Sequence, residues 1–308
     1  MKLVHLVFVC VVVVVGLTGC ASRCSCTDVI EAEGLIAPGA TLQEVSTDFK
    51  FTEGPATDVQ GNVYFTDQPN DRIMIYTTEG KLETFMQPAG RANGMYFDQD
   101  GYLLACADDN SELWKIDVAT KEHEVLARDY QGVRLNSTND LWVRPDGNIY
   151  ITDPFYKRPW WTHDKPTQDG QHVYFLKPDT GELTRVLDDL VQPNGLIGTP
   201  DGKTLYLSDI KGGRIYQYDV QKDGALTNRK LFCEMGSDGM TLDCCGNVYL
   251  ANRKGVVVFD KAGQQIENIK IPQGWTANVT FGGKDRKLLF VTAKTGVYTL
   301  QMNVCGAK

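Results

Sequence analysis

The chain alternates short apolar runs with turn sequences, and this arrangement returns six times. In five units a turn precedes a run rich in β-branched and aromatic residues, and the turn glycines are Gly61, Gly101, Gly147, Gly202 and Gly246. A sixth, weaker copy has Arg286 at the glycine position. Turns of this kind before alternating apolar residues predict β-hairpins. Successive turns lie about 40–55 residues apart, the length of one four-stranded propeller blade.

A second hairpin follows the first in most units. In the third unit, strand-like segments 172–176 and 183–187 flank a Pro-Asp-Thr-Gly turn. No sustained helical period occurs after the first 20 residues. The sequence therefore predicts an all-β fold, a six-bladed β-propeller with four antiparallel strands per blade.

The last unit lacks an outer strand. Residues 296–300 give its third strand, and little chain follows them. The segment 41–45 has strand character but no partner nearby in the sequence. We predict that this N-terminal strand closes the last blade, because closure removes exposed sheet edges.

The N-terminus has the parts of a secretory signal. A short basic start is followed by the apolar stretch 3–16 and by Leu-Thr-Gly-Cys, which ends at Cys20. This ending resembles a bacterial lipobox, whose cysteine becomes lipidated; a plain secretory signal with an incidental cysteine is the alternative. The apolar stretch is short for a membrane span, and a lipid would anchor the protein without spanning the bilayer.

Three segments are expected from these features: a lipoprotein signal peptide over 1–20, a tether over 21–38 and the propeller over 39–308. The expected location is outside the cytoplasm, with a lipid anchor at Cys20 facing the periplasm or the cell surface. Membrane contact through any other part is not expected.

Composition and charge narrow the range of possible functions. With 308 residues, 42% of them hydrophobic, the chain can bury a large core. The net charge of −8 without a basic block disfavours nucleic acid as a partner, because phosphate binding needs clustered Lys and Arg. Of nine cysteines, seven follow the signal, and none has zinc-ligand spacing; their pairing stays open.

One polar position repeats in every unit. Eight residues before the turn position lies a residue with a side-chain oxygen, in the order Glu53, Asn93, Asn139, Asn194, Asp238 and Asn278. If these residues begin the innermost strands, all six lie at one end of the central channel. The loops that follow the second strand of each blade return to the same end.

This ring of oxygens is suited to a hard cation. Calcium takes six to eight oxygen ligands from Asp, Glu, Asn and water, whereas zinc favours His or Cys. The alternative is a structural polar collar, since Asn and Asp bridge strand ends through backbone hydrogen bonds. A collar explains Asn93 and Asn278 without a metal, but it explains Glu53 poorly because a partly buried carboxylate needs a partner.

The loop 154–163 follows the third unit's second strand and carries Trp160, Trp161, Lys157 and Arg158. These side chains could stack on a sugar ring and hold a carboxylate, or the loop could pack its own aromatics. His163 and His172 are weaker candidates for a general base. No G-x-S-x-G, P-loop or G-x-G-x-x-G motif is present.

The motifs resemble those of the SMP-30/gluconolactonase family of six-bladed propellers. The matching segments, in family order, are 51–55, 92–94, 136–140, 150–154, 169–174, 193–195 and 238–240. The resemblance implies one divalent metal held by the residues that match Glu53, Asn194 and Asp238. The residue matching Asn139 lies by the metal and contacts substrate in that family, and it is a calcium ligand in related phosphotriesterase propellers.

The resemblance implies a hydrolase that opens a sugar lactone with metal-activated water. The expected metal ligands are Glu53, Asn139, Asn194 and Asp238, with Asp238 also as the catalytic base. The expected substrate contacts are Asn93, Asn139 and Trp160. The ion is expected to be Ca²⁺, with Zn²⁺, Mn²⁺ or Mg²⁺ as alternatives, and the protein to be a monomer with a small-molecule lactone as its partner.

Two departures from the family pattern leave the substrate open. Some members have an arginine where this chain has Ser137, and many have Glu-His where Cys106 is followed by Ala107 and Asp108. The alternative functions are a phosphotriesterase-type hydrolase on the same calcium site and a non-catalytic ligand-binding propeller, because the fold alone does not choose among them.

Overall fold

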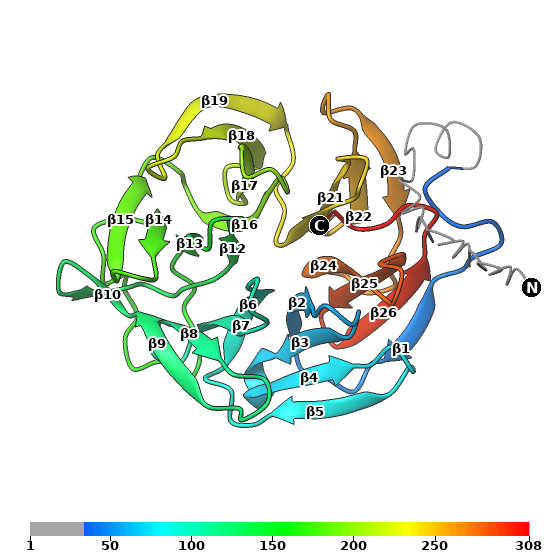
Figure 1. Ribbon diagram of the computed structural model, residues 1–308, viewed down its shortest axis with the longest axis horizontal. Helices are drawn as coiled ribbons and strands as arrows, with labels where there is room; N and C mark the ends of the chain where they lie inside the picture. The colour runs from blue at the N-terminus through cyan, green and yellow to red at the C-terminus, as the bar shows by residue number, and fades with distance from the viewer. Residues whose placement is uncertain (1–33, 308) are drawn as a thin grey trace, which may run out of the picture.

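The computed structural model describes residues 34–307, which form six four-stranded antiparallel sheets arranged as blades around a central axis (Figure 1). The predicted six-bladed β-propeller is confirmed. The expected signal peptide, the lipidated Cys20 and most of the expected tether lie outside the described residues, so they stay predictions. No helix in the described residues is long and apolar enough to span a bilayer.

The strands are given from the innermost outward. The first two blades are β2 (Thr52–Thr57), β3 (Val63–Asp67), β4 (Arg72–Tyr76) and β5 (Leu82–Met86), then β6 (Ala92–Phe97), β7 (Leu103–Ala107), β8 (Glu112–Ile116) and β9 (His123–Ala127). The next two are β12 (Leu141–Val143), β13 (Ile149–Asp153), β14 (His172–Lys177) and β15 (Glu182–Leu187), then β16 (Pro193–Gly198), β17 (Thr204–Asp209), β18 (Arg214–Val220) and β19 (Leu226–Cys233). The last two are β20 (Met240–Leu242), β21 (Val248–Asn252), β22 (Gly255–Phe259) and β23 (Gln265–Ile269), then β24 (Asn278–Gly282), β25 (Leu288–Ala293), β26 (Gly296–Gln301) and β1 (Gln43–Ser46).

Two small elements lie between the blade strands. A 3-10 turn, η1 (Gln68–Asn70), follows β3, and a two-residue hairpin, β10 (Asp129–Tyr130) with β11 (Val133–Arg134), precedes β12. Neither changes the blade count. Both lie in connections, where the sequence repeat is weakest.

The repeated turn builds the first hairpin of each blade. In the first blade, the Asp58 carboxylate accepts hydrogen bonds from the backbone nitrogens of Gln60 and Asn62, at 3.0 and 2.9 Å. Gly61 adopts a φ of 95°, which favours glycine because it has no Cβ. Arg286 has a φ of 58°, so the sixth unit uses the same left-handed conformation without a glycine. The weaker sixth copy is thereby confirmed as a true member of the repeat.

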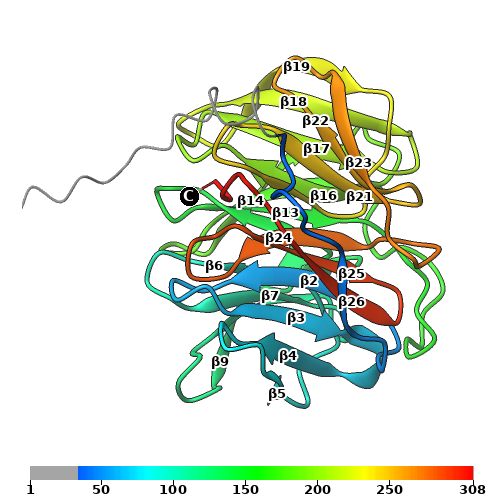
Figure 2. The same cartoon turned by 90° about the vertical axis from the view of Figure 1, so that its right-hand side faces the viewer.

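The ring closes as predicted, with an N-terminal strand as the outer strand of the last blade. β1 pairs antiparallel with β26, with Gln43 opposite Thr299. The described end of the expected tether also contacts this blade: Leu35 is 5% exposed in its core, and Ile36 bridges to Met302. Figure 2 shows this N-terminal segment running down the side of the ring beside β26.

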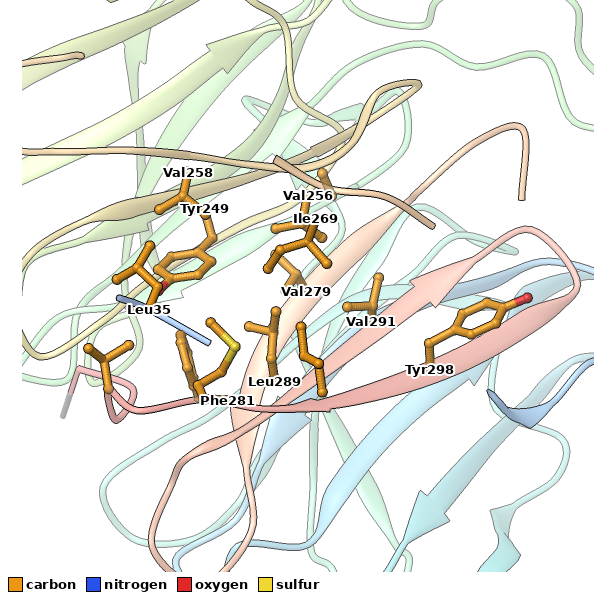
Figure 3. Packing of buried hydrophobic residues seen from close by; sticks show 14 of the residues in the cluster. Leu35, Tyr249, Val256, Val258, Ile269, Val279, Phe281, Leu289, Val291 and Tyr298 are labelled. Atoms are coloured by element: carbon orange, nitrogen blue, oxygen red, sulfur yellow. The ribbon is translucent and has the colours of Figure 1, made fainter. Parts of the chain in front are cut away.

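Apolar side chains fill the spaces between neighbouring blades. One cluster joins the fifth and sixth blades, where Tyr249 and Val256 face Val279, Leu289 and neighbouring residues (Figure 3). Because each strand alternates its side chains, both faces of a blade are buried against its neighbours. This packing holds the innermost strands at a fixed distance from the axis, and each of them contacts the innermost strands of the two adjacent blades.

Candidate functional site

The six repeated oxygen-bearing residues lie at one end of the innermost strands. They occupy equivalent places: Glu53, Asn93 and Asn194 are second in β2, β6 and β16, Asn278 is first in β24, and Asn139 and Asp238 lie two residues before β12 and β20. The innermost strands surround the centre of the ring (Figure 1). The repeat therefore brings these side chains together at one channel mouth.

Glycine lets the ring residues of neighbouring blades approach. A Cβ on Gly54, directly after Glu53, would lie 1.9 Å from the carbonyl oxygen of Asn93. A Cβ on Gly239, after Asp238, would lie 1.9 Å from Cγ of Asn278. Any side chain at these two positions would push the blades apart at the ring.

Four of the six ring residues line a cavity of about 600 Å³, namely Glu53, Asn93, Asn139 and Asp238. A larger cavity of about 860 Å³ lies toward the other end of the innermost strands, near the first-hairpin turns, and Asn278 lines that one. We place the site in the smaller cavity because it holds both ring carboxylates. Phe51, Tyr156, Gln192 and Trp275 form part of its walls.

Glu53 is a buried carboxylate with one oxygen directed to protein donors. The residue is 4% exposed, and its Oε2 accepts hydrogen bonds from Gly54 N at 2.8 Å and Asn278 Nδ2 at 3.2 Å. Within residues 34–307, Oε1 receives no hydrogen bond. Burial first, and then the charge of Asp238, raise the pKa of Glu53 well above its usual range. Its ionised form therefore needs positive charge nearby.

Asp238 lies in the same chamber with both oxygens hydrogen-bonded. Oδ1 accepts from Asn194 Nδ2 at 2.9 Å, and Oδ2 accepts from Trp275 Nε1 at 2.6 Å. Burial raises the pKa of Asp238 to about 6, against these hydrogen bonds and the charge of Arg158. The carboxylate is thus oriented by two donors while the chamber disfavours its charge.

The ring amides divide into those with and without protein partners. Asn93 and Asn139 are 5% and 4% exposed, and their side chains form no hydrogen bond with any described residue. Asn194 donates its side-chain nitrogen to Asp238 and, at 2.6 Å, to the Tyr156 hydroxyl. Its side-chain oxygen receives no hydrogen bond from the described residues. Asn278 uses both atoms, donating to Glu53 and accepting from Val279 N, as a collar residue would.

The donor set fits a hard divalent cation. It offers two carboxylates and amide oxygens that lack protein donors, which is the ligand chemistry of calcium. The described residues contain no group of three or more His, Cys, Asp or Glu side chains that could hold a metal. A site here therefore has to combine the two carboxylates with amides, and Glu53, Asn139, Asn194 and Asp238 are the residues present for it.

The loop between β13 and β14 covers the cavity with residues other than the predicted one. Tyr156 and Arg158 line the cavity, whereas Trp160 is not among the described lining residues. The Trp160 ring instead lies against the guanidinium groups of Arg91 and Arg158, at 4.7 and 5.7 Å. A substrate contact by Trp160 stays a prediction. His163 stacks on Trp161 at 4.7 Å, outside the lining.

Sequence reasoning missed two residues that touch the ring. Tyr156 accepts from Asn194, and Trp275 donates to Asp238. Trp275 lies three residues before Asn278, in a connection whose length differs from blade to blade. No repeat position marks either residue, so only their aromatic character near the ring positions could have drawn attention to them.

The chain is similar to a known protein family and to several known proteins. The SMP-30/gluconolactonase/LRE-like region matches residues 51–295. The chain is 27% identical to a gluconolactonase of Zymomonas mobilis over 303 residues, covering 89% of this chain and 85% of the relative. It is 30% identical to lactonohydrolase oryL of Aspergillus oryzae, covering 75% of this chain and 61% of that protein. A solved gluconolactonase structure from Xanthomonas campestris superposes with a TM-score of 0.80 at 30% identity, covering 87% of this chain and 91% of that one.

Glu53→Gln tests the cation site directly. The change keeps the side chain's size but removes one of the two charges that face the cation, so calcium affinity should fall at least about tenfold. Isothermal titration of chelator-stripped protein measures this affinity. Glu44→Gln, the same change at an exposed position on β1, should bind calcium as the wild type does. Unchanged binding by Glu53→Gln would contradict the site.

Calcium affinity should also depend on pH. The raised pKa values of Glu53 and Asp238 mean that the metal-free chamber holds protons up to a higher pH than ordinary carboxyls do. Each carboxyl must lose its proton to bind the cation, so affinity should fall at least about tenfold from about pH 8 to about pH 5. The same titration repeated across this range provides the measurement. A constant affinity would show that the cation binds elsewhere.

Proposed function

The chain belongs to the SMP-30/gluconolactonase/LRE-like family, and on that premise we propose that it is a metal-dependent hydrolase that opens a sugar lactone. The observation that carries the proposal is that two carboxylates, the buried Glu53 and the partly buried Asp238, line one cavity with Asn93 and Asn139, whose side chains make no hydrogen bond within residues 34–307. The relatives named gluconolactonase and lactonohydrolase support lactone hydrolysis as the reaction.

A divalent cation held by Glu53, Asn139, Asn194 and Asp238 would supply positive charge that polarises the lactone carbonyl and stabilises charge developing on its oxygen. We expect Ca²⁺, because the donors are carboxylate and amide oxygens. Zn²⁺, Mn²⁺ and Mg²⁺ are the alternatives to be tested.

Asp238 is the proposed general base. It takes a proton from the attacking water as the water oxygen bonds to the carbonyl carbon. The ring C–O bond then breaks, and Asp238 returns the proton to the ring oxygen, which leaves as the hydroxyl of the hydroxy acid. Asn194 and Trp275 hold the carboxylate in position through Oδ1 and Oδ2. Cation binding weakens Asp238 as a base, but a lactone is an activated ester, so a weak base suffices.

Asn93 and Asn139 bind substrate in this proposal. Their side chains face the cavity and make no hydrogen bond within the described residues, so their donors and acceptors suit the hydroxyl groups of a sugar lactone. Tyr156 and Phe51 add apolar wall next to them. This combination orients the ring of the substrate so that its carbonyl faces Asp238.

Metal removal tests the reaction class. Chelator-stripped protein should hydrolyse D-glucono-1,5-lactone at no more than about one hundredth of the loaded rate, because the cation supplies several kcal/mol of charge stabilisation. A pH-indicator assay follows the acid that is released. Adding back Ca²⁺, Zn²⁺, Mn²⁺ or Mg²⁺ separately should restore the rate with at least one ion. Failure of every ion to restore hydrolysis would refute the proposal.

Asp238→Asn tests the base. The amide keeps the shape of the side chain but cannot accept a proton from water, so kcat should fall at least about 100-fold, as should that of Asp238→Ala. The assay is run at saturating metal on protein whose metal content has been measured. Asp243→Asn is the matched control, since Asp243 is buried in the same blade but lies outside the cavity. Substantial turnover by folded, metal-loaded Asp238→Asn would overturn the assignment.

A further inference from the structure

The two sequence positions that depart from the family pattern meet in one contact. Ser137 Oγ donates to Asp108 Oδ1, and Asp108 Oδ2 accepts from Arg158 Nε at 3.0 Å and from Gln68 Nε2 at 3.3 Å. The Asp108 side chain is fully buried, and the Arg158 side chain is 17% exposed. Trp161 Nε1 also donates to the Asp108 carbonyl at 3.0 Å. The loop between β13 and β14 is thereby fastened to the loop between β7 and β8.

This fastening holds Arg158 over the cavity. Arg158 lines the cavity together with Glu53 and Asp238, and its charge lowers the pKa of Asp238. Its guanidinium lies 5.2 Å from the centre of the Tyr156 ring. Asp108 occupies Nε, while the two terminal nitrogens make no hydrogen bond within residues 34–307. A guanidinium that is held through Nε and keeps both terminal nitrogens available as donors is suited to bind an oxyanion.

Three more cations line the same cavity. Lys211, Arg253 and Lys294 each lie one or two residues after the second strand of their blade, in the fourth, fifth and sixth blades. None of the three forms an ion pair with a carboxylate of the described chain. Arg253 lies over the Trp275 ring at 5.2 Å, close to the residue that holds Asp238. Four successive blades thus present a cation at one mouth.

The cavity has too few anions to balance these cations, of which Arg158 alone has an ion-pair partner, Asp108, within the described residues. Its described lining contains two carboxylates, Glu53 and Asp238, and the proposed cation would neutralise both. The whole chain has 31 Lys and Arg against 39 Asp and Glu, so its net charge is negative. An excess of positive charge at this mouth is therefore opposite in sign to the net charge of the chain. Such a mouth attracts an anionic ligand through long-range electrostatics.

Building on the proposed lactone hydrolysis, we propose that this mouth binds an anionic substituent of the substrate, so that the preferred substrate is a sugar lactone carrying a carboxylate, sulfonate or phosphate group. Arg158 is the residue that determines this specificity, and Asp108 and Ser137 are positioning residues that act through it. The lactone carbonyl lies at Asp238, deeper in the cavity, while the anionic group lies at the rim. A neutral lactone would leave Lys211, Arg253 and Lys294 without a carboxylate partner in the described chain.

A set of three lactones tests the proposal on the metal-loaded protein. They are D-glucono-1,5-lactone, which is neutral, its 6-phosphate, and D-glucaro-1,4-lactone, which carries a carboxylate. The wild type should have a kcat/KM at least about tenfold higher on a charged lactone than on the neutral one, because charge-assisted hydrogen bonds add binding energy. The better of the two charged lactones identifies the type of anion.

Arg158→Gln should remove this preference. Its kcat/KM should fall at least about tenfold more on the charged lactone than on the neutral one, and the extra loss should appear mainly in KM. The neutral lactone thereby reports that the variant is folded and active. Lys157→Ala removes a charge from the same loop, at an exposed residue outside the cavity lining, and should change neither value.

Two further readouts separate positioning from a merely structural role. Raising salt from about 0.01 M to about 0.3 M should slow the charged lactone and leave the neutral one unchanged, as screening predicts. Asp108→Asn should also raise KM for the charged lactone, and the double variant with Arg158→Gln should be no worse than Arg158→Gln alone. Additive losses in the double variant would show that Asp108 does not act through Arg158.

The failures of the two proposals are distinguishable. If the wild type prefers the neutral lactone, or if Arg158→Gln slows both kinds of lactone alike, the anion site is wrong while lactone hydrolysis stands. If the loaded wild type opens none of the three lactones, the proposed function fails, and the anion site fails with it.

Discussion

The burial of two like charges in one small chamber is the constraint on which the site depends. Glu53 and Asp238 come from the first and fifth blades, 185 residues apart in sequence, yet burial raises the pKa of both, and the charge of Asp238 raises that of Glu53 further. Taking carboxylates out of water is costly unless they are paired or protonated. The donors around them, from Gly54, Asn278, Asn194 and Trp275, orient the oxygens but bring no charge. The proposed cation would resolve this conflict and make the pair useful for catalysis.

In this propeller, the ring residues and the residues around them come from different parts of each blade. The starts of the innermost strands supply the floor of the cavity, and the symmetry of the ring fixes their places. The loops between the second and third strands, together with the segments that enter the innermost strands, supply the walls, and their sequences differ from blade to blade. Arg158 and its contact with Asp108 belong to these loops. The floor can therefore keep one chemistry while the walls select the substrate, as loops on a rigid scaffold commonly do.

The sequence predicted the fold well because its signals are local. The turn chemistry around Asp58 and Gly61 is set by neighbouring residues, and its repetition gave the blade count, the closing strand and the ring positions. Even Arg286 could be aligned, since its neighbours keep the pattern without the glycine. These features needed no knowledge of contacts between distant segments.

The walls of the site could not be predicted in the same way. Tyr156 and Trp275 reach the ring through loops without a repeat, and the position of Arg158 depends on Asp108, which lies 50 residues earlier in the chain. The sequence pointed to Trp160 in the correct loop, but the cavity is lined by its neighbours. Loop conformation follows from tertiary contacts that no local pattern encodes.

The most direct measurement of the central claim is a crystal structure of the protein loaded with Ca²⁺ or Mn²⁺, with anomalous scattering used to locate the ion. We predict one ion in the ring, about 2.0–2.6 Å from oxygens of Glu53 and Asp238 and of the neighbouring amides. An ion bound elsewhere, with these two carboxylates protonated or paired only with protein groups, would contradict the account.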